Sequence, residues 1–291
     1  VVDNVHIIYD SNQAKSTFEG MLTSHGVSLS GLNWENISND SVWIRDYGPL
    51  PIVSDTGVPA IVDLRYYHQR VYDDAIPTIL GNQWGLTVYR APIDFEGGNF
   101  MSDTQGNCFA SQGLLWYNSA DEATIRSYMQ TYVGCDTLTI YQALNEEGTT
   151  HIDMQSKLVS DSTVIVGEYT TAMDAANKQI TDSNAALMTS LGWNVVRMPM
   201  PTNSDGAFRS YINSLFLNGV NMVPVYSVNQ DLQAEAMAIW QNVMPTWTHV
   251  PMNSDDVIQW AGAIHCITMT VADGPYSAIE ATPAYACDGD W

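Results

Sequence analysis

The feature that most constrains the fold is a local pattern that recurs five times along the chain. Each copy contains a segment with the apolar spacing of an amphipathic helix, which ends in Gly or Pro, and then a short β-rich run. A polar turn and a second β-rich run complete each copy. The predicted helices cover residues 11–26, 73–85, 119–134, 181–192 and 230–245.

The second β-rich runs align with one another, and the equivalent position in each run is polar except in the last, where it is a cysteine. A unit of this size cannot bury its apolar face alone, so successive units must pack on each other. Five such units can close into a ring, which brings their equivalent positions to its axis. These positions, 53, 52, 62 and 53 residues apart, are Asp46, Asn99, His151, Asn213 and Cys266.

The repeat predicts an α/β fold and a single catalytic domain over residues 1–291. An alternative is that the polar residues only form turns, but a purely structural repeat would more often place apolar residues or glycine there. The approximate ranges of the five repeats are 1–54, 55–112, 113–167, 168–226 and 227–291.

The charge of the chain restricts its partners. Ten Lys and Arg against 32 Asp and Glu give a formal charge of −22, which repels nucleic acid and anionic membranes and attracts cations. No segment approaches the roughly 20 apolar residues of a membrane helix, so membrane insertion is not expected. The acid excess could also serve solubility alone. Together with only three lysines, it favours a secreted or extracytoplasmic protein.

The chain has four cysteines, and their roles differ. Cys108 and Cys135 could pair in an oxidising compartment, although free buried thiols are equally compatible with the sequence. Cys266 stands in "GAIHCITMTV" and could be a packing residue, half of a disulfide, a metal ligand or a nucleophile. The run reads as a strand, on which the neighbouring His265 points away from Cys266 and is structural.

Two further motifs supply carboxylates at equivalent positions. "WIRDYGP" carries Asp46, and "THIDM" carries His151 and Asp153 two residues apart, so on a strand both side chains share one face. A cysteine near a histidine can act as a thiolate nucleophile. Paired carboxylates suit a planar guanidinium, because a carboxylate accepts two parallel hydrogen bonds from it. The sequence therefore predicts an arginine-like or amidine-like substrate.

Five motifs in order, "WIRDYGP", "FEGGNF", "THIDM", "SYINSLFLN" and "GAIHCIT", resemble those of the guanidino-group-modifying enzymes, in the branch of agmatine deiminases and bacterial peptidylarginine deiminases. The resemblance covers nearly the whole chain. It implies a pentein fold, an α/β propeller of five blades with pseudo-fivefold symmetry. Family members usually have a strand ahead of "NVHIIYD", so the first blade could be incomplete.

The resemblance also implies roles for individual residues. Cys266 attacks the guanidinium carbon and forms a covalent thiouronium adduct, while His151 protonates the leaving amine and later activates water. Asp46 and Asp153 hold the guanidinium nitrogens. The remaining residues that the resemblance assigns to the active site or its walls are Asn213, Trp43, Glu96, Gly97, Gly98 and Asn99.

The substrate is less tightly specified. In the peptidylarginine branch an Arg-x-Arg pair captures a terminal carboxylate, and "RYYHQRVYDD" aligns His68 and Arg70 with that pair. Arg70 alone could bind a carboxylate or carbonyl, or it could be a solvated charge. We expect peptidyl or protein arginine as substrate, converted to citrulline. Agmatine is the alternative, and it would need an additional carboxylate near its distal amine.

Three rival functions remain. A cysteine amidase or protease has no use for two carboxylates beside its thiol. An inactive binding module would not need the complete set of catalytic side chains, and an amidinotransferase shares the adduct but transfers it to an amine. No cofactor or metal is expected, and the acidic "NSDD" at 253–256 reads as a solvated loop because it lacks the alternation of a calcium loop.

Overall fold

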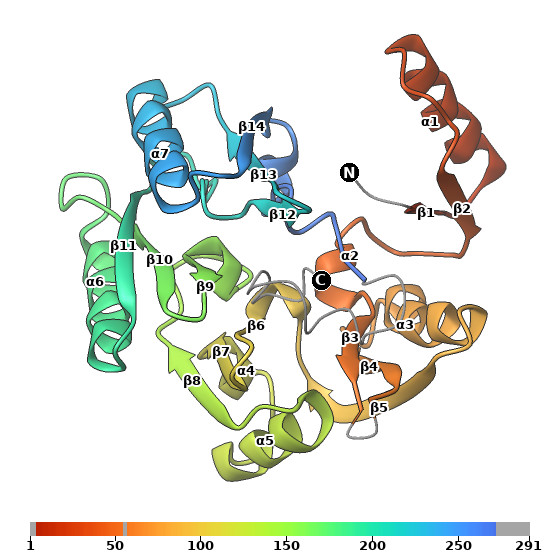
Figure 1. Cartoon of the computed structure of the whole chain (residues 1–291), viewed down its shortest axis with the longest axis horizontal. Coiled ribbons are helices and arrows are strands. Elements are labelled where there is room, and N and C mark those ends of the chain that lie inside the picture. Colours follow the sequence, from red (N-terminus) through yellow and green to blue (C-terminus); the bar gives the residue numbers. More distant parts are fainter. Residues whose placement is uncertain (1–3, 55–56, 272–291) are drawn as a thin grey trace.

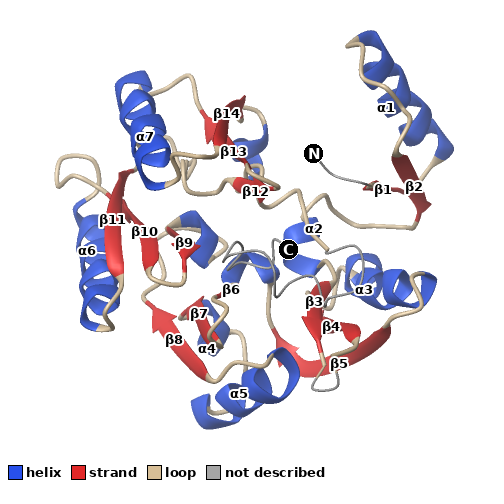
Figure 2. Ribbon diagram, in the orientation of Figure 1, coloured by secondary structure: helices blue, strands red, loops and turns tan. Residues whose placement is uncertain are grey.

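The computed structural model describes residues 4–54 and 57–271, which form five small sheets (Figure 1). The sheets are distributed around the centre of the molecule, and a helix lies on the outer side of each (Figure 2). The fold is therefore α/β, as predicted.

The first sheet contains two parallel strands joined through one helix. β1 (Val5–Tyr9) pairs with β2 (Leu32–Asn36), and α1 (Asn12–Ser24) connects them. Ser11 caps α1, since its hydroxyl accepts a hydrogen bond from the backbone N–H of Ala14 at 3.2 Å. Among the described residues this sheet has one strand fewer than the other four.

The other four sheets share one topology. Two antiparallel strands are followed by a helix and then by a third strand, which is parallel to the second. In chain order the elements are β3 (Leu50–Val53), β4 (Pro59–Arg65), α3 (Val71–Gln83), β5 (Thr87–Asp94); β6 (Met101–Ser102), β7 (Asn107–Ser111), α4 (Gly113–Trp116), α5 (Glu122–Tyr128), β8 (Thr137–Tyr141); β9 (Ser156–Ser160), β10 (Thr163–Glu168), α6 (Ala175–Ser190), β11 (Asn194–Pro199); β12 (Leu215–Leu217), β13 (Val220–Val225), α7 (Gln230–Val243) and β14 (Thr248–Asn253).

All five predicted helices are present. The largest difference is at α6, which begins at Ala175 and not at residue 181. Asp174 explains the earlier start, because its carboxylate accepts a hydrogen bond from the backbone N–H of Asn177 at 2.9 Å and so caps the helix. The last turn of the third predicted helix is a π-helix over Met129–Val133, which ends at Gly134 with φ +82°.

Strand pairing crosses the limits of the predicted repeats. β7 lies in the range 55–112 and pairs with β8 of the range 113–167, and the sheets of β10–β11 and β13–β14 join successive ranges in the same way. Each of these sheets thus takes strands from two consecutive copies of the pattern. This exchange supplies the packing between copies that a small unit needs in order to bury its apolar face.

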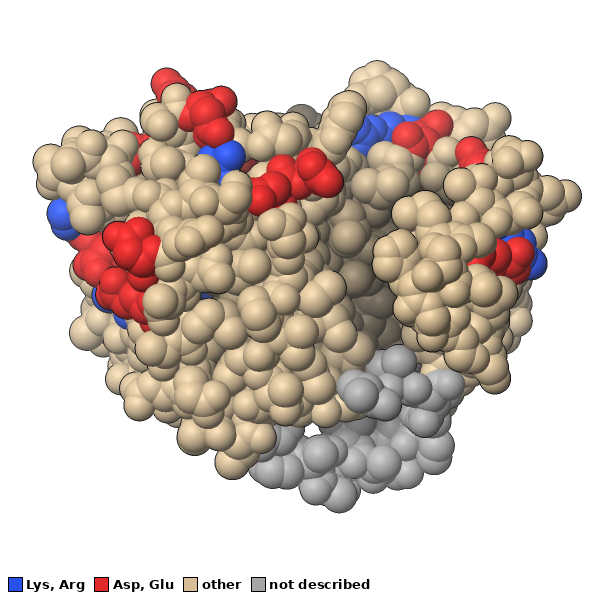
Figure 3. Space-filling view, turned by 90° about the horizontal axis from the view of Figure 1, so that it is seen from above, with Lys and Arg blue, Asp and Glu red and all other residues tan. Residues whose placement is uncertain are grey.

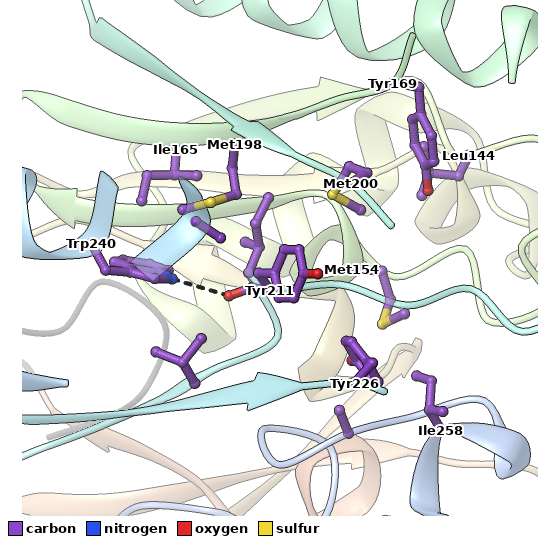
Figure 4. Close-up of a cluster of buried hydrophobic side chains, with 14 of the residues drawn as sticks. Leu144, Met154, Ile165, Tyr169, Met198, Met200, Tyr211, Tyr226, Trp240 and Ile258 are labelled. Carbon is purple, nitrogen blue, oxygen red and sulfur yellow. Dashed lines mark hydrogen bonds between the residues drawn. The ribbon is translucent and has the colours of Figure 1, made fainter. Parts of the chain in front are cut away.

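Apolar clusters between the sheets and their helices hold the sheets together. In the largest, Trp240 of α7 is fully buried and donates a hydrogen bond from its indole N–H to the carbonyl of Tyr211 at 3.1 Å (Figure 4). A second cluster contains a Cys108–Cys135 disulfide, with a Cα–Cα distance of 5.5 Å, so these two cysteines are paired. Tyr211 lies two residues before Asn213, so this packing also supports a predicted site residue.

The surface agrees with the acidic composition. Asp and Glu side chains gather in several groups on the face drawn in Figure 3, where Lys and Arg are few. Within residues 4–54 and 57–271, no helix has the length and apolar character required to cross a membrane.

Candidate active site

The five equivalent positions lie in turns, bends and short helical segments or beside them, and none lies in a strand. Asp46 lies on the four-residue helix α2 (Ile44–Tyr47), and Asp153 lies in the 3-10 helix Ile152–Met154. Cys266 lies in a turn as well. The predicted strands for "THIDM" and "GAIHCITMTV" are therefore wrong, because short apolar runs do not reveal their backbone conformation.

The turns are nevertheless connected to one another by backbone hydrogen bonds. The N–H of Arg45 donates to the carbonyl of Cys266 at 3.2 Å, and the N–H of His265 donates to the carbonyl of Asn213 at 3.4 Å. The first of these bonds joins residues more than 200 positions apart in sequence. The predicted convergence of the equivalent positions is therefore observed for these motifs, although through turns.

Cys266 is buried, with 3% of its surface exposed, and it is a free thiol. The Nδ2 atom of Asn213 donates a hydrogen bond to Sγ at 3.3 Å, and Asp153 Oδ2 lies 3.9 Å from the same sulfur. Burial raises the pKa of Cys266 well above its usual value, and the carboxylates of Asp153 and Asp46 raise it further. The resting site therefore holds a protonated thiol.

His151 lies between two buried carboxylates. Its Nε2 is 3.1 Å from Glu96 Oε2, and its Nδ1 is 3.6 Å from Asp46 Oδ1. Burial lowers the pKa of His151, but the charges of Asp46 and Glu96 outweigh burial, so the pKa stands well above its usual value. His151 is thus an imidazolium in the resting site and can donate a proton.

Asp153 is fixed by His265. The Nδ1 atom of His265 lies 2.6 Å from Asp153 Oδ2, and both side chains are buried. Burial raises the pKa of Asp153 to about 6, while burial and the nearby charge of Arg45 lower the pKa of His265 well below its usual value. A neutral His265 that donates from Nδ1 orients the carboxylate, so the histidine next to the cysteine contacts the site through Asp153.

Among the described residues, one oxygen of each carboxylate lacks a hydrogen-bond donor, although Asp46 Oδ1 lies 3.6 Å from His151 Nδ1. Asp46 Oδ1 and Asp153 Oδ1 are buried, and neither accepts a hydrogen bond from any residue in the part of the chain that the structure describes. Buried carboxylate oxygens normally have donors. A guanidinium would supply those donors, because it carries five N–H groups in one plane.

The predicted wall residues contribute in different ways. A Cβ on Gly98 would lie 2.5 Å from His151 Nδ1, so only glycine allows the imidazole its present position. Asn99 is structural, because its Oδ1 accepts hydrogen bonds from the backbone N–H groups of Ser111 and Ile152 at 2.8 and 3.2 Å.

Gly97 and Trp43 complete this wall. A Cβ on Gly97 would lie 2.2 Å from the carbonyl oxygen of Arg45, so that glycine permits close approach of the two backbones. A Cβ on Gly262 would lie 2.5 Å from the Trp43 ring and 3.1 Å from the Cys266 sulfur, which places Trp43 beside the thiol.

Of the two residues aligned with the carboxylate-binding pair, only His68 lines a pocket. Arg70 donates a hydrogen bond to the hydroxyl of Tyr66 at 2.9 Å, and its guanidinium lies over the rings of Tyr66 and Tyr67 at 5.7 and 5.5 Å. His68 is exposed and lines a pocket. Arg70 is thus engaged by tyrosines, and it does not line that pocket.

The pocket has a volume of about 320 Å³ and extends outward from the buried residues Glu96, Asn99 and His151. Its volume is at the lower end of the range of small-molecule sites, roughly 300 to 1,000 Å³. Aromatic side chains form much of its wall. The other lining residues are Arg65, Tyr66, Tyr67, His68, Asp94, Phe95, Leu114, Tyr117 and Thr149.

Several of these residues escaped the sequence analysis. Tyr67 donates a hydrogen bond from its hydroxyl to Glu96 Oε1 at 2.7 Å and so positions Glu96 against His151. Arg65 and Asp94 form an ion pair in the pocket wall. Asp94 precedes Glu96 by two residues in "DFEGGN", a spacing that could have indicated a shared face.

A divalent cation is the other ligand that the acidic groups could hold. Asp46, Glu96 and His151 each offer one ligand atom, and these atoms lie within 4.8 Å of one another. Asp46 is also one of the two carboxylates with an oxygen, Oδ1, that accepts no hydrogen bond from the described residues. The expectation that no metal is needed stays a prediction.

This fold and site define a class of protein, the deiminases, which are hydrolases acting on C–N bonds of guanidino groups. The chain belongs to the Porphyromonas-type peptidyl-arginine deiminase family, whose model matches residues 2–271. The family resemblance inferred from the five motifs is confirmed.

Individual relatives are distant but extensive. A Vibrio parahaemolyticus protein that carries the name agmatine deiminase is 24% identical over 275 residues, which cover 80% of this chain and 76% of the relative. The crystal structure of a Porphyromonas gingivalis protein described as an arginine deiminase has a TM-score of 0.80 at 19% identity and covers 91% of this chain and 84% of the other. The Enterococcus faecalis agmatine deiminase structure has a TM-score of 0.76 at 19% identity and covers 90% and 81%.

Proposed function

We propose that this protein hydrolyses the guanidinium group of agmatine to a ureido group and ammonia. The observation that carries the proposal is the pair of buried oxygens, Asp46 Oδ1 and Asp153 Oδ1, which accept no hydrogen bond from the described residues. They lie in the site that holds the Cys266 thiol and the His151 imidazolium. A guanidinium bound there would satisfy both carboxylates and present its carbon to sulfur.

The first half of the reaction forms a covalent adduct. A bound guanidinium neutralises the carboxylates that raise the pKa of Cys266, so the thiol can ionise and release its proton to solvent water. The sulfur attacks the guanidinium carbon, and His151 gives its proton to the departing nitrogen, which leaves as ammonia. Asn213 hydrogen-bonds the sulfur and stabilises its negative charge.

The second half releases the product. His151 is now neutral and takes a proton from a water molecule, which attacks the carbon of the thiouronium adduct. The carbonyl forms as the C–S bond breaks, the hydroxyl proton passes to the departing sulfur and restores the thiol, and the ureido compound leaves. Asp46 and Asp153 hold the nitrogens of the substrate throughout, while Glu96 keeps His151 in position.

Agmatine is preferred over peptidylarginine for three reasons. Relatives that carry the agmatine deiminase name align with about 80% of this chain, and the pocket of about 320 Å³ suits a small molecule. Arg70, aligned with a carboxylate-binding arginine, is engaged by Tyr66. Peptidylarginine, the substrate expected from the sequence, remains the second candidate because the family description names it.

Two broader expectations are part of the same proposal. The five sheets and their outer helices would be the blades of a pentein propeller, since four of them repeat one topology (Figure 1). The Cys108–Cys135 disulfide supports export to an oxidising compartment, because such bonds are rare in reducing ones.

The test is direct. Agmatine, free arginine and peptides with internal or C-terminal arginine are incubated separately with the protein, and ammonia and ureido product are measured. We expect the highest kcat/KM for agmatine, and a loss of about a thousandfold or more in Cys266→Ala. Ammonia release from none of these compounds, or equal rates in Cys266→Ala and the parent, would refute the proposal. A higher kcat/KM for peptides, reduced in Arg70→Ala, would favour peptidylarginine.

A further inference from the structure

The pocket wall contains an ion pair that the reaction itself does not use. Arg65 ends β4 and Asp94 ends β5, and the two residues are paired in the register of the sheet. Arg65 Nη2 lies 3.6 Å from Asp94 Oδ2, and the side chains are 43% and 48% exposed. Both line the pocket that reaches His151.

The Asp94 carboxylate has capacity for another partner. Charge-assisted hydrogen bonds are about 2.7–2.9 Å long, so the contact of 3.6 Å with Arg65 is an ion pair without a hydrogen bond. Within residues 4–54 and 57–271, no side chain donates a hydrogen bond to this carboxylate. The backbone of Asp94 is fixed, since its N–H and carbonyl both bond to the Asn118 side chain at 2.9 and 2.7 Å.

The spacing between Asp94 and Glu96, which both line the pocket, is similar to the length of one class of ligand. Asp94 precedes Glu96 by two residues of extended chain, which places their Cα atoms about 6–7 Å apart. Four methylene groups between a guanidinium and an amine span a similar length. Tyr117 and Leu114 lie in the same pocket and offer apolar surface to such a chain.

We propose that Asp94 binds the distal cation of the substrate and selects guanidino amines over guanidino compounds with a neutral or anionic tail. The inference rests on the proposed function and adds to it the residue that recognises the far end of the substrate. Arg65 carries the opposite charge, so it repels the ammonium and limits how tightly Asp94 binds it. Asp94 is a specificity residue and takes no part in bond making.

The experiment compares two substrates that differ only in the tail charge, agmatine and N-acetylagmatine. In Asp94→Asn we expect kcat/KM for agmatine to fall about tenfold, mainly through KM, while kcat/KM for N-acetylagmatine stays within about twofold. Asp182→Asn is the matched control. Asp182 is 41% exposed and pairs with Lys178 and Arg197 at 2.5 and 2.9 Å, on α6 and outside the pocket.

The second variant tests the other half of the pair. Arg65→Gln removes the repulsion between Arg65 and the ammonium, so kcat/KM for agmatine should rise severalfold. A fall in Arg65→Gln equal to that in Asp94→Asn would show that the pair only stabilises the fold, and the inference would be overturned. The same conclusion follows if Asp94→Asn lowers kcat/KM equally for both substrates, or for neither.

Failure of the proposed function gives a different result. If the parent protein releases ammonia from neither compound, the deiminase proposal fails and this inference fails with it. If the parent releases ammonia and only the dependence on tail charge is missing, the deiminase proposal stands and Asp94 is not the specificity residue.

Discussion

The packing of Gly98 against His151, the proposed general acid, allows a quantitative prediction for the Gly98→Ala variant. The added methyl carbon would lie 2.5 Å from His151 Nδ1 and 2.8 Å from Asp46 Oδ1. Nonbonded contacts to carbon are comfortable at about 3.5 Å, so the imidazole must move by about 1 Å. The methyl group therefore displaces the proposed acid and a proposed substrate-binding carboxylate together.

The expected effect is much larger on the rate than on stability. A misplacement of about 1 Å in an active site can reduce the rate about a hundredfold, so we expect a loss of this size in kcat/KM for agmatine. Overpacking costs about 1–3 kcal/mol of unfolding free energy, and the lower chain entropy of unfolded alanine offsets about 0.4–1 kcal/mol of that. The protein should thus remain folded.

The rate of ammonia release at several agmatine concentrations gives kcat and KM, and unfolding in urea gives the free energy of unfolding. Gly20→Ala is the control, because Gly20 lies on α1 and a Cβ there meets no atom within 4 Å. Gly20→Ala should leave kcat/KM unchanged. If folded Gly98→Ala also keeps kcat/KM within about threefold of the parent, the imidazole does not need its present position and the reasoning is wrong.

Three further predictions concern charge, cross-linking and metal. Glu96→Gln removes a charge that raises the pKa of His151, so His151 should lose its proton at lower pH in this variant. The alkaline limb of the kcat/KM profile should therefore move to lower pH. An unchanged limb would show that the Glu96 charge does not keep His151 protonated. Cys135→Ser breaks the disulfide to Cys108 and should lower the unfolding free energy by about 3 kcal/mol in urea titrations, while kcat at 25 °C is preserved. Equal urea midpoints for the variant and the parent would refute this stabilising role. Dialysis against a chelator should leave ammonia release unchanged, and a loss that added Zn²⁺ restores would instead assign a metal to Asp46, Glu96 and His151.

The helices and the order of elements could be predicted from the sequence because local signals determine them. Apolar residues at helical spacing and terminal glycines such as Gly134, at φ +82°, act within a few residues. The predicted start of α6 is wrong because Asp174 caps the helix seven residues before that position. Strand exchange between repeats could not be read from the pattern, because nothing local to β7 specifies that it pairs with β8.

The candidate site was predictable as a set of residues but not in its local geometry. The spacing between Asp46, His151 and Cys266 identified equivalent positions, and the turns that carry them were mistaken for strands because their apolar neighbours are buried in either conformation. The contact of His265 with Asp153 joins residues 112 positions apart. Such a pairing depends on contacts between distant parts of the chain, so no short-range signal indicates it.

The buried carboxylates explain why a deiminase site needs a cationic substrate before it reacts. Asp46 raises the pKa of both His151 and Cys266, so one negative charge keeps the imidazole charged and the thiol neutral. A charged acid and a neutral thiol form an unreactive pair. A bound guanidinium removes the effect on the thiol, because its positive charge compensates Asp46 and Asp153, whereas Glu96 still hydrogen-bonds His151 at 3.1 Å. The acids proposed to bind the substrate would thus restrict formation of the thiolate to the substrate complex. A cysteine and a histidine without these neighbouring carboxylates would lack that control.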